Sequence, residues 1–463
     1  MKNIISLLIC FCFMLSITAC GAADETEPLI VTDENIADNE SGEITDFEED
    51  ENTVTSKQKN SSGKGNSSKK NNGNKYSSGK SKNSSKKASS LKSANTSSGV
   101  RYPKEQKIIT IRKANQDSFK KIGRWDTAGY KLGIGLNWSC SSVEFNVDCK
   151  DDLAIQFQKG GGTSPLFMKI YVDGKAIEER TKIEKSGELT IATGLQPGVH
   201  NVKIVRQSDV ECPTFTLLKI LAKGKLADPP KENPIYIEAI GDASLIGWGV
   251  KLEDSFFNDF YANTSEKQPI ARNKENQDGT LAYPYVAAEK LGADLYVLAR
   301  QGAGIAATYH KNSEGYCNPR AGLLPTMHQY MYTSGNKLYE AERTPDVFVI
   351  DAGAADLNSS LQKIVKDGDN IGINTVRATE ISVGFLKQLK SINPNAKIIW
   401  CYGLTKNITK NKALEDYILK IVAQVNGVYA LKLPLSKRGE YPSVSEHAAA
   451  ATLLANKIKQ VLK

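Results

Sequence analysis

The sequence predicts a mixed α/β chain in which a β-sandwich precedes a doubly wound parallel-sheet domain. In residues 101–228, short segments alternate apolar with polar residues and are separated by turn pairs such as Asp173-Gly174 and Pro197-Gly198. In residues 229–463, apolar runs of strand length are instead separated by helix-like stretches. A proline-rich segment, "LADPPKENP", lies between the two patterns and predicts a stiff linker.

Residues 1–19 have the layout of an export signal. Lys2 precedes the apolar run "IISLLICFCFMLSI", which is shorter than the ~20 residues that a permanent membrane-spanning helix needs. The segment "SITAC" resembles a bacterial lipobox, in which the signal is cut before the cysteine and a diacylglycerol is attached to its sulfur. We therefore expect Cys20 to be a lipidated N-terminus that anchors the chain to a membrane. The alternative is a plain secretory signal with an incidental cysteine.

Residues 20–100 predict a disordered tether. The stretch is acidic at first and then consists mainly of Ser, Lys, Asn and Gly, so it offers little apolar burial to offset the entropy cost of ordering. A flexible coil of ~80 residues spans about 50 Å root-mean-square, which suits a leash through a cell wall. Its lysines indicate either a solvated, self-repelling spacer or an attraction to anionic wall polymer or lipid.

The strands of the sandwich and of the parallel sheet can be assigned from the pattern. Regular spacing of short strands without helical periodicity favours a sandwich in the first domain, and strands alternating with helices favour a parallel sheet covered on both faces in the second. The predicted sandwich strands are "QKIITI", "SVEFNVDC", "LAIQFQ", "PLFMKIYVDGK", "GELTIATG", "HNVKIVRQ" and "FTLLKILA". The predicted parallel strands are "PIYIEAIGD", "ADLYVLARQG", "PDVFVIDAG", "AKIIWCYG" and "GVYALKLP". The predicted helices include "LAYPYVAAEKLG", "NTVRATEISVGFLKQLKSI" and "SVSEHAAAATLLANKIKQVL".

Composition argues against two classes of partner. The net charge of the chain is +8, but the folded part has no Lys/Arg stripe interleaved with aromatic residues, so we expect no nucleic-acid partner. The cysteines after the anchor show no C-x-x-C pair and no histidine at zinc spacing. We expect buried thiols, with or without one disulfide, and neither a metal site nor a cofactor. These cysteines are Cys140, Cys149, Cys212, Cys317 and Cys401.

Four glycine- or alanine-rich turns follow the predicted parallel strands: "GDAS", "RQGAG", "DAGAAD" and "YGLT". Because the carboxyl ends of parallel strands meet at one edge of a sheet, where ligands bind in such folds, these turns predict a cleft. The order of the blocks resembles the SGNH, or GDSL-type, hydrolases, and the sandwich in front narrows the resemblance to the second family of carbohydrate esterases. Those enzymes are extracellular deacetylases of plant polysaccharides with an N-terminal jelly-roll and a C-terminal SGNH domain.

The resemblance covers nearly all of residues 101–463. In the sandwich it rests on "YVDGK" and "GLQPGVHNVKIVRQSD". In the second domain it rests on "IEAIGDASLIGWG", "VLARQGAGI", "PDVFVIDAGAADLN" and "YPSVSEH". It implies that a serine in G-D-S attacks the acetyl carbonyl and that a histidine takes its proton, while the serine N–H, a glycine and an asparagine hold the oxyanion.

At these positions the sequence departs from the family. Ala243, Ala355 and Tyr441 stand where the serine, asparagine and histidine are expected, and neither Arg438 nor Gly439 supplies the usual orienting aspartate. Only Gly302 or Gly304 remains in role. Loss of a hydroxyl nucleophile or of its histidine each lowers turnover by ~10⁴–10⁶. The resemblance therefore implies a site with no confident catalytic residue.

A serine next to the nucleophile position does not restore the pattern. Family members have glycines four and six residues after the serine, and Gly247 and Gly249 stand at those distances from Ala243. Ser244 is thus one position late, and we expect its side chain to point elsewhere.

The histidines offer no obvious base. His447 matches a helix-borne family histidine that we expect to pack, and His200 lies in the sandwich. His310 and His328 follow the "RQGAG" block and could reach the rim, but we expect neither to act as a base.

We therefore expect a non-catalytic surface lipoprotein on the extracellular face of a bacterial membrane, binding a polysaccharide or acetylated glycan through the cleft or the sandwich. Two alternatives stay open: an active carbohydrate esterase that uses non-standard residues, and a structural protein of the cell envelope. Aromatic side chains can stack on sugar rings, and nearby polar groups can hydrogen-bond to the sugar. The alternative is that these aromatic side chains only pack against the loops. We expect Tyr441 to fill the pocket that a catalytic base would occupy. The candidate cleft residues are Asp242, Ser244, Trp248, Gly304, Asp356 and Tyr402.

Overall fold

The computed structural model describes a single compact unit within residues 94–463. The described ranges are 101–126, 132–258, 267, 270, 272–307, 323–333, 337–357, 371–405 and 411–463, with backbone alone at 371–375 and 411. The predicted signal and tether, Cys20, His310 and Cys317 lie outside these ranges. No helix in the described ranges is both long and apolar enough to cross a membrane.

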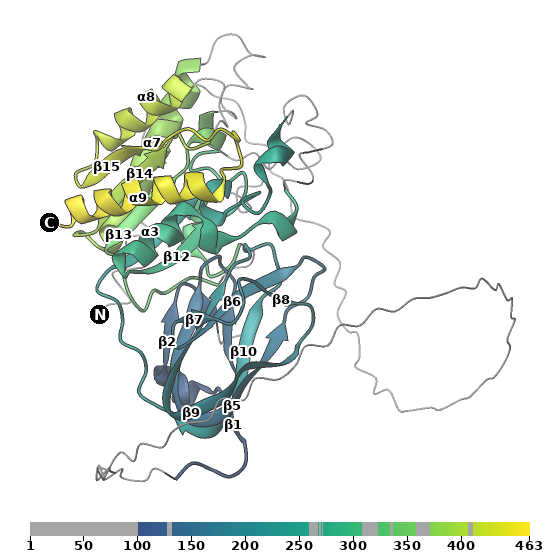
Figure 1. The fold of residues 1–463 in the computed structure, drawn as a ribbon. Coiled ribbons are helices and arrows are strands. Elements are labelled where there is room, and N and C mark those ends of the chain that lie inside the picture. The colour runs from purple at the N-terminus through teal and green to yellow at the C-terminus, as the bar shows by residue number, and fades with distance from the viewer. Residues whose placement is uncertain are drawn as a thin grey trace, which may run out of the picture. The chain divides into compact units, whose positions relative to one another are not determined.

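The first domain is a ten-stranded antiparallel sheet that curls into a jelly-roll-like sandwich (Figure 1). Along the main path the strand order is β3-β4-β10-β5-β9-β6-β7, with β1 beside β10, β2 beside β5 and β8 beside β6. The strands are β1 (Lys107–Thr110), β2 (Phe119–Ile122), β3 (Trp125–Asp126), β4 (Ile134–Leu136), β5 (Ser142–Lys159), β6 (Leu166–Val172), β7 (Lys175–Ala176), β8 (Thr181–Ile183), β9 (Gly187–Arg206) and β10 (Phe215–Leu226). A 3-10 helix, η1 (Lys113–Ser118), follows β1.

Two pairs of predicted strands are continuous in this sheet. The segments predicted at 142–149 and 153–158 form β5, and those predicted at 187–194 and 200–207 form most of β9. The pairing of β5 with β9 shifts register around Asp151, whose φ of 64° marks a bulge. Pro197-Gly198, predicted to be a turn, therefore lies inside β9, where Gly198 pairs with Cys149. A bulge absorbs extra residues without ending the strand. It interrupts the alternation of apolar and polar residues, and the sequence pattern therefore predicts strand ends where the strand continues.

The second domain contains a parallel five-stranded sheet in the order β12-β11-β13-β14-β15. Its strands are β11 (Tyr236–Gly241), β12 (Asp294–Ala299), β13 (Val347–Asp351), β14 (Lys397–Tyr402) and β15 (Val428–Lys432). Its helices are α3 (Tyr283–Leu291), α5 (Leu324–Gln329), α7 (Ile371–Ile392), α8 (Asn411–Val422) and α9 (Val444–Val461). Short 3-10 helices are η2 (Ala243–Ile246), η3 (Asp254–Phe257), η4 (Lys274–Asn276) and η5 (Gly279–Leu281).

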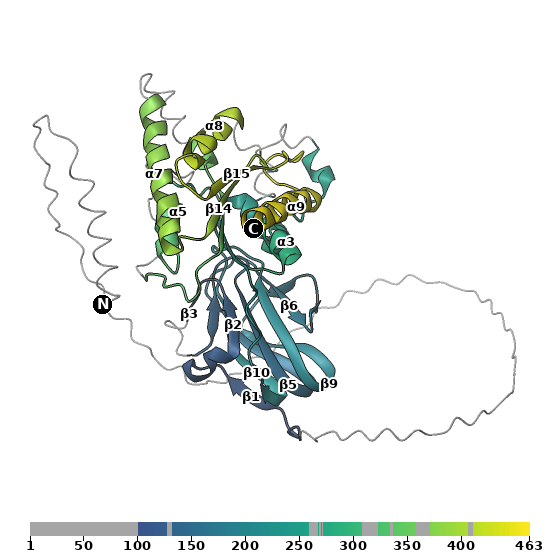
Figure 2. The same ribbon diagram turned by 90° about the vertical axis from the view of Figure 1, so that its left-hand side faces the viewer.

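Helices cover both faces of this sheet, as the alternation of strands and helices predicts. One face packs against α5, α7 and α8, and the other packs against α3 and α9 (Figure 2). Along β13, Phe348 and Ile350 belong to the first core and Val347 and Val349 to the second. Successive side chains of a strand point to opposite faces, so each of these strands must be apolar at nearly every position.

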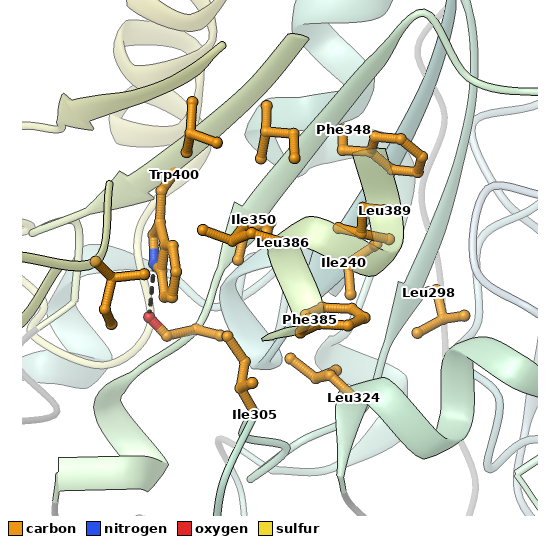
Figure 3. Close-up of a cluster of buried hydrophobic side chains, with 14 of the residues drawn as sticks. Ile240, Leu298, Ile305, Leu324, Phe348, Ile350, Phe385, Leu386, Leu389 and Trp400 are labelled. Atoms are coloured by element: carbon orange, nitrogen blue, oxygen red, sulfur yellow. Dashed lines mark hydrogen bonds between the residues drawn. The ribbon is translucent and has the colours of Figure 1, made fainter. Parts of the chain in front are cut away.

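The core under α7 shows how tightly the strand ends are held. Phe385, Leu386 and Leu389 of α7 lie among sheet residues such as Ile350 and Trp400 (Figure 3). The indole N–H of Trp400 donates a 3.0 Å hydrogen bond to the carbonyl oxygen of Ala352, just beyond β13. A buried polar group thereby fixes the start of the loop that carries the predicted "DAGAAD" turn.

A buried arginine joins the two domains. Arg124, in the turn between β2 and β3, has no exposed surface and donates to the carbonyl oxygens of Met327 at 3.0 Å and His328 at 2.8 Å. Its Nη2 also lies 3.5 Å from Oε1 of Glu238 on β11. The indole N–H of Trp138 donates to Met331 O at 2.8 Å. The first domain therefore holds the C-terminal end of α5 through backbone carbonyls.

Candidate functional site

The carboxyl ends of β11, β12 and β13 meet at one edge of the sheet, here called the rim. Asp242 N donates to Asp351 O at 3.2 Å, and Arg300 N donates to Gly241 O at 3.2 Å, so the three strand ends are directly connected. Gly241 permits this approach, because a Cβ there would lie 2.1 Å from Asp351 O. The blocks predicted to converge are therefore brought together by backbone contact.

Ala243 begins η2 immediately after β11. The Asp242 carboxylate accepts hydrogen bonds from two backbone amides on the same oxygen, Oδ1: Ala243 N at 2.6 Å and Gly302 N at 2.5 Å. The resemblance assigns these two amides to an oxyanion, which would have to displace the carboxylate. Burial, aided by nearby Asp351, raises the pKa of Asp242 to about 7 against the lowering effect of the amides.

Asp356 braces the loop that follows Gly302. Its carboxylate accepts from Ala306 N at 2.6 Å, from Ala307 N at 2.7 Å and from Ile305 N at 3.1 Å. Burial raises the pKa of Asp356, and these three amides lower it. Gly304 is required by the same loop, because a Cβ there would lie 1.8 Å from Ala307 O. Asp356 and Gly304, both candidate ligand residues, thus shape the rim.

Ala355 and Ser244 lie on either side of this arrangement. Ala355, at the predicted asparagine position, is buried. Ser244 is also buried, and its hydroxyl donates to Asp351 Oδ2 at 2.6 Å. The hydroxyl of Tyr283 donates to the same oxygen at 3.0 Å. Ser244 is therefore directed towards the end of β13.

Tyr441 occupies the predicted histidine position as a packed side chain. It is 2% exposed, and its ring lies 6.2 Å from that of Phe257. Arg272 Nε donates to its hydroxyl at 3.1 Å. Gly249 makes room for the ring, because a Cβ there would lie 2.9 Å from Tyr441 Cβ. A phenol ring held in this way has no imidazole nitrogen to accept a proton.

The described histidines are engaged with other groups. His447 on α9 is fully buried, and its Nδ1 accepts from Tyr283 N at 3.2 Å. Burial lowers the pKa of His447 to about 4, so it is neutral at pH 7. His328 Nε2 lies 3.3 Å from Glu238 Oε1 in the core, and His200 Nδ1 lies 2.7 Å from Asp173 Oδ2 on the sandwich. His310 lies outside the described residues.

Two predicted stacking residues are covered. Trp248 is 4% exposed, and the ammonium of Lys274 lies 4.7 Å from its ring centroid. Tyr402 is also buried, and its hydroxyl donates to Glu415 Oε1 at 3.0 Å. Stacking of a sugar on either ring stays a prediction, and it requires the covering groups to move.

A charged cluster beside the rim was missed by sequence reasoning. Glu211, from the segment between β9 and β10, binds Arg300 Nε at 2.8 Å and Lys274 Nζ at 2.7 Å. Burial raises the pKa of Glu211, but Lys274 and Arg300 prevail and lower it to about 2. Lys274 also pairs with Asp209. The acidic residues at the end of the family-like "VRQSD" segment and just after it, Asp209 and Glu211, could have indicated that the first domain reaches the rim.

The cysteines and acidic groups of the described ranges bear on metal chemistry. No group of three or more His, Cys, Asp or Glu side chains in the described ranges is placed to hold a metal ion. The four described cysteines after the anchor are buried and free. Burial raises the pKa of Cys149 to about 11 and that of Cys212 to about 12, so both are inert thiols near neutral pH.

Comparisons with known proteins agree with this architecture. Residues 121–230 match the model of the carbohydrate esterase 2 N-terminal domain. A family two carbohydrate esterase from Clostridium thermocellum, solved in complex with cellohexaose, is 21% identical with a TM-score of 0.60 and covers 74% of this chain and 99% of its own. An acetyl xylan esterase, Est2A, from Butyrivibrio proteoclasticus is 18% identical with a TM-score of 0.62 and covers 77% and 99%.

A third solved carbohydrate esterase is described as having an active site with divergent catalytic and non-catalytic binding functions. It is 20% identical with a TM-score of 0.55 and covers 74% of this chain and 97% of its own. No curated protein matches the chain by sequence. The chain is thus similar to the family 2 carbohydrate esterases in the sequence of its first domain and in the two-domain fold.

Proposed function

We propose that this chain is a non-catalytic relative of carbohydrate esterases that binds polysaccharide at a bacterial cell surface. One observation carries the proposal: the turn after β11 presents the methyl group of Ala243, and the amides of Ala243 and Gly302 are bonded to Asp242. Acyl transfer needs a nucleophile, a base within hydrogen-bond reach and donors for the oxyanion. The rim offers a methyl group, the phenol of Tyr441 and occupied amides in those places.

These replacements are expected to lower the rate of hydrolysis by a large factor. Removing a hydroxyl nucleophile or its base each lowers turnover by ~10⁴–10⁶, and such losses overlap when the groups act as a unit. An oxyanion asparagine contributes a further ~10²–10³, and Ala355 stands in its place. Residual hydrolysis at this rim is therefore expected to be close to the uncatalysed rate.

Binding of a glycan is supported by the kind of protein that this chain resembles. The Clostridium thermocellum structure holds cellohexaose, and another related esterase is described as having a non-catalytic binding function. In this chain the binding surface is the rim or the sandwich, and the ligand is a polysaccharide or an acetylated glycan. The Glu211, Lys274 and Arg300 cluster places hydrogen-bonding groups beside the rim.

The place of action follows from the N-terminal sequence. Lipidation of Cys20 would anchor the chain on the extracellular face of the membrane, and the tether of residues 20–100 would let the folded part reach through the wall. A chain exported in this way does not meet nucleic acid. Metabolic labelling with a fatty-acid analogue tests the anchor, because Cys20→Ala should abolish the label.

One observation favours the alternative of an active esterase. Ser244 Oγ lies 2.6 Å from Asp351 Oδ2, which places a hydroxyl against a buried carboxylate. Because that same oxygen also binds the Tyr283 hydroxyl, the arrangement is equally that of a structural hydrogen-bond pair. A third function, a purely structural part of the envelope, would require neither hydrolysis nor glycan binding.

Two measurements separate these functions. The purified protein should release no acetate from acetylated xylan or from an aryl acetate beyond a buffer control, and a fluorophosphonate probe should label no hydroxyl stoichiometrically. Affinity electrophoresis against a panel of polysaccharides should show retardation on at least one of them. Stoichiometric labelling that Ser244→Ala abolishes would establish the active esterase instead. Absence of retardation on every polysaccharide would leave the structural role.

A further inference from the structure

A pocket lies at the opposite end of the parallel sheet from the rim. It has a volume of about 90 Å³ and is lined by residues of both domains, among them Lys121 and Trp125 of the first and Tyr236, Asp294, Glu342 and Arg343 of the second. Tyr236 begins β11, Asp294 begins β12 and Arg343 lies just before β13. Because β11 is six residues long, about 20 Å of strand separates this pocket from Ala243.

The wall contributed by the first domain is fixed in place. Gly123 has a φ of +90°, and a Cβ there would lie 2.9 Å from Tyr296 Cβ, so the turn between β2 and β3 lies directly against β12. The next residue, Arg124, is buried and bonded to the end of α5. Its guanidinium also covers the ring of Tyr339, 4.3 Å from the centroid, and Tyr339 lines the pocket. A pocket held in this way needs little ordering when a ligand enters.

The cations of the pocket are paired with its carboxylates, and the lining has one carboxylate more than it has cations. Asp294 binds Lys120 Nζ at 2.7 Å and Arg343 Nη1 at 3.0 Å. Lys121 Nζ lies 3.7 Å from Glu342 Oε2, and Arg343 Nε lies 3.5 Å from Glu232 Oε2. Each cation is already paired, so an anionic ligand would have to break an existing pair. Paired carboxylates and guanidinium groups still have free directions for hydrogen bonding, and a hydroxyl can donate to one and accept from the other.

An aromatic ring completes the lining. Trp125 is half-buried, with the ammonium of Lys121 4.0 Å from its ring centroid. The other three tryptophans of the chain, Trp138, Trp248 and Trp400, are buried. Lys121 lies over this indole as Lys274 lies over Trp248, but Trp125 keeps exposed surface where Trp248 is buried. Once the ammonium moves aside, the ring suits a ligand with one apolar face and a ring of hydroxyls.

We propose that this pocket binds one residue of a neutral sugar, with the pyranose ring against Trp125 and its hydroxyls bonded to Glu342 and Arg343. The volume accommodates one ring face and no folded segment of another protein. This site is independent of the rim, and it stands whether or not the rim binds glycan. Either a free saccharide or the end of a polysaccharide chain could supply the ring.

Tryptophan fluorescence tests the proposal directly, because Trp125 is the one tryptophan that is not buried. The purified protein is titrated with the methyl β-glycosides of glucose, xylose and N-acetylglucosamine and with cellotetraose and xylotetraose. At least one should give a saturable change, with an affinity on the order of 1 mM for a single ring. A methyl glycoside that matches the tetramer indicates a free saccharide, and a tetramer that binds far better indicates the end of a chain.

Matched variants assign the site. Trp125→Phe should remove the fluorescence change, and calorimetry should show several-fold weaker binding. Trp248→Phe, which alters the tryptophan beside the rim, should leave both signals unchanged. Glu342→Gln should weaken binding about 3-fold without affecting folding, because its side chain is 61% exposed. Thermal unfolding of each variant checks that the fold is intact.

The contrary results are equally clear. If no glycoside changes the fluorescence or the calorimetric signal at ~50 mM, the pocket binds no sugar. If the change survives in Trp125→Phe and disappears in Trp248→Phe, the sugar binds at the rim, which would support the proposed function and overturn this inference.

Discussion

The two ends of the parallel sheet use their carboxylates in different ways. At the rim, Asp242 and Asp356 accept hydrogen bonds from backbone amides and so hold loops in place. At the amino end of the strands and within the domain contact, Asp294 and Glu238 pair with the cations Lys120 and Arg124. The rim therefore uses these acids to brace loops, and the other end uses its acids in ion pairs that join the domains. The comparison teaches that the partner of a buried carboxylate, a backbone amide or a cation, decides what the carboxylate holds together.

Arg124→Ala should have the largest effect, because it acts at the ion-pair end. It removes the donor to the Met327 and His328 carbonyls and leaves the buried Glu238 with His328 and the Tyr296 hydroxyl as its partners. Removing one partner of a buried pair destabilises by about 3–5 kcal/mol. Urea unfolding at pH 7 measures this, with Arg180→Ala for comparison, because Arg180 also binds backbone carbonyls, those of Lys274 and Gln277, while its charge acts on the buried Asp278 and not on Glu238.

The pH dependence of the same variant sharpens the test. Burial raises the pKa of Glu238, but His328 and Arg124 prevail and hold it below its ordinary value. A depressed carboxyl pKa adds stability above the unfolded value of ~4.3 and loses it as the pH falls through the folded value. The deficit of Arg124→Ala should therefore shrink at acid pH. If the variant lost the same free energy of unfolding at neutral and at acid pH, Glu238 would not be the buried charge that the substitution leaves unpaired.

Restoring the expected residues tests whether the rim has kept a usable geometry. The triple variant Ala243→Ser, Ala355→Asn and Tyr441→His should hydrolyse an aryl acetate at least ~10²-fold faster than the unmodified chain. The activity should remain modest, because Arg438 and Gly439 supply no orienting carboxylate. The control keeps Ala243 and carries only the other two changes. A folded triple variant that is as inert as the control would show that Asp242 keeps the amides or that the loops are wrongly placed.

Much of the fold could be predicted from the sequence, because local pattern determines it. The five parallel strands have apolar residues at nearly every position, and the helices between them carry an apolar face, so their order and type follow from periodicity. The continuity of β5 and β9 could not be predicted. A bulge at Asp151 depends on pairing with a distant strand, and Pro197-Gly198 has the composition of a turn while lying inside that strand.

The candidate site could likewise be predicted only in part. The blocks that carry Asp242, Gly302 and Asp356 were expected at one edge, and they meet there because parallel strands end together. The roles of these residues could not be read from the sequence, because spacing does not show which amide a carboxylate will accept. Glu211 was missed for a related reason: it comes from the first domain, and only the packing of the two domains brings it to Arg300.

Asp242→Asn tests how the carboxyl group that binds the two rim amides makes stability depend on pH. Burial raises the pKa of Asp242 to about 7, so its contribution to stability is full below the unfolded pKa of ~3.9 and is lost as the pH rises through about 7. Asparagine does not titrate. The stability of the native protein relative to the variant should therefore fall between pH 4 and pH 8, by on the order of 4 kcal/mol. Chemical unfolding across this range measures the difference, and a constant difference would mean that the carboxyl does not change its charge there.

Ser244→Ala should have the smallest effect. It tests whether the serine at the rim is a structural hydrogen-bond donor or a contact for the ligand. The change removes the 2.6 Å hydrogen bond to Asp351 and leaves that carboxylate with the Tyr283 hydroxyl. A hydroxyl that donates to a carboxylate contributes about 1.5–3 kcal/mol, so unfolding by urea should show a loss near the lower end of that range, because the Tyr283 hydroxyl stays in place. Glycan binding should be unchanged in affinity electrophoresis, because the hydroxyl is already engaged inside the protein. A loss of glycan binding without any loss of stability would instead place Ser244 in contact with the ligand, and the rim would then be open where the hydrogen bonds indicate that it is closed.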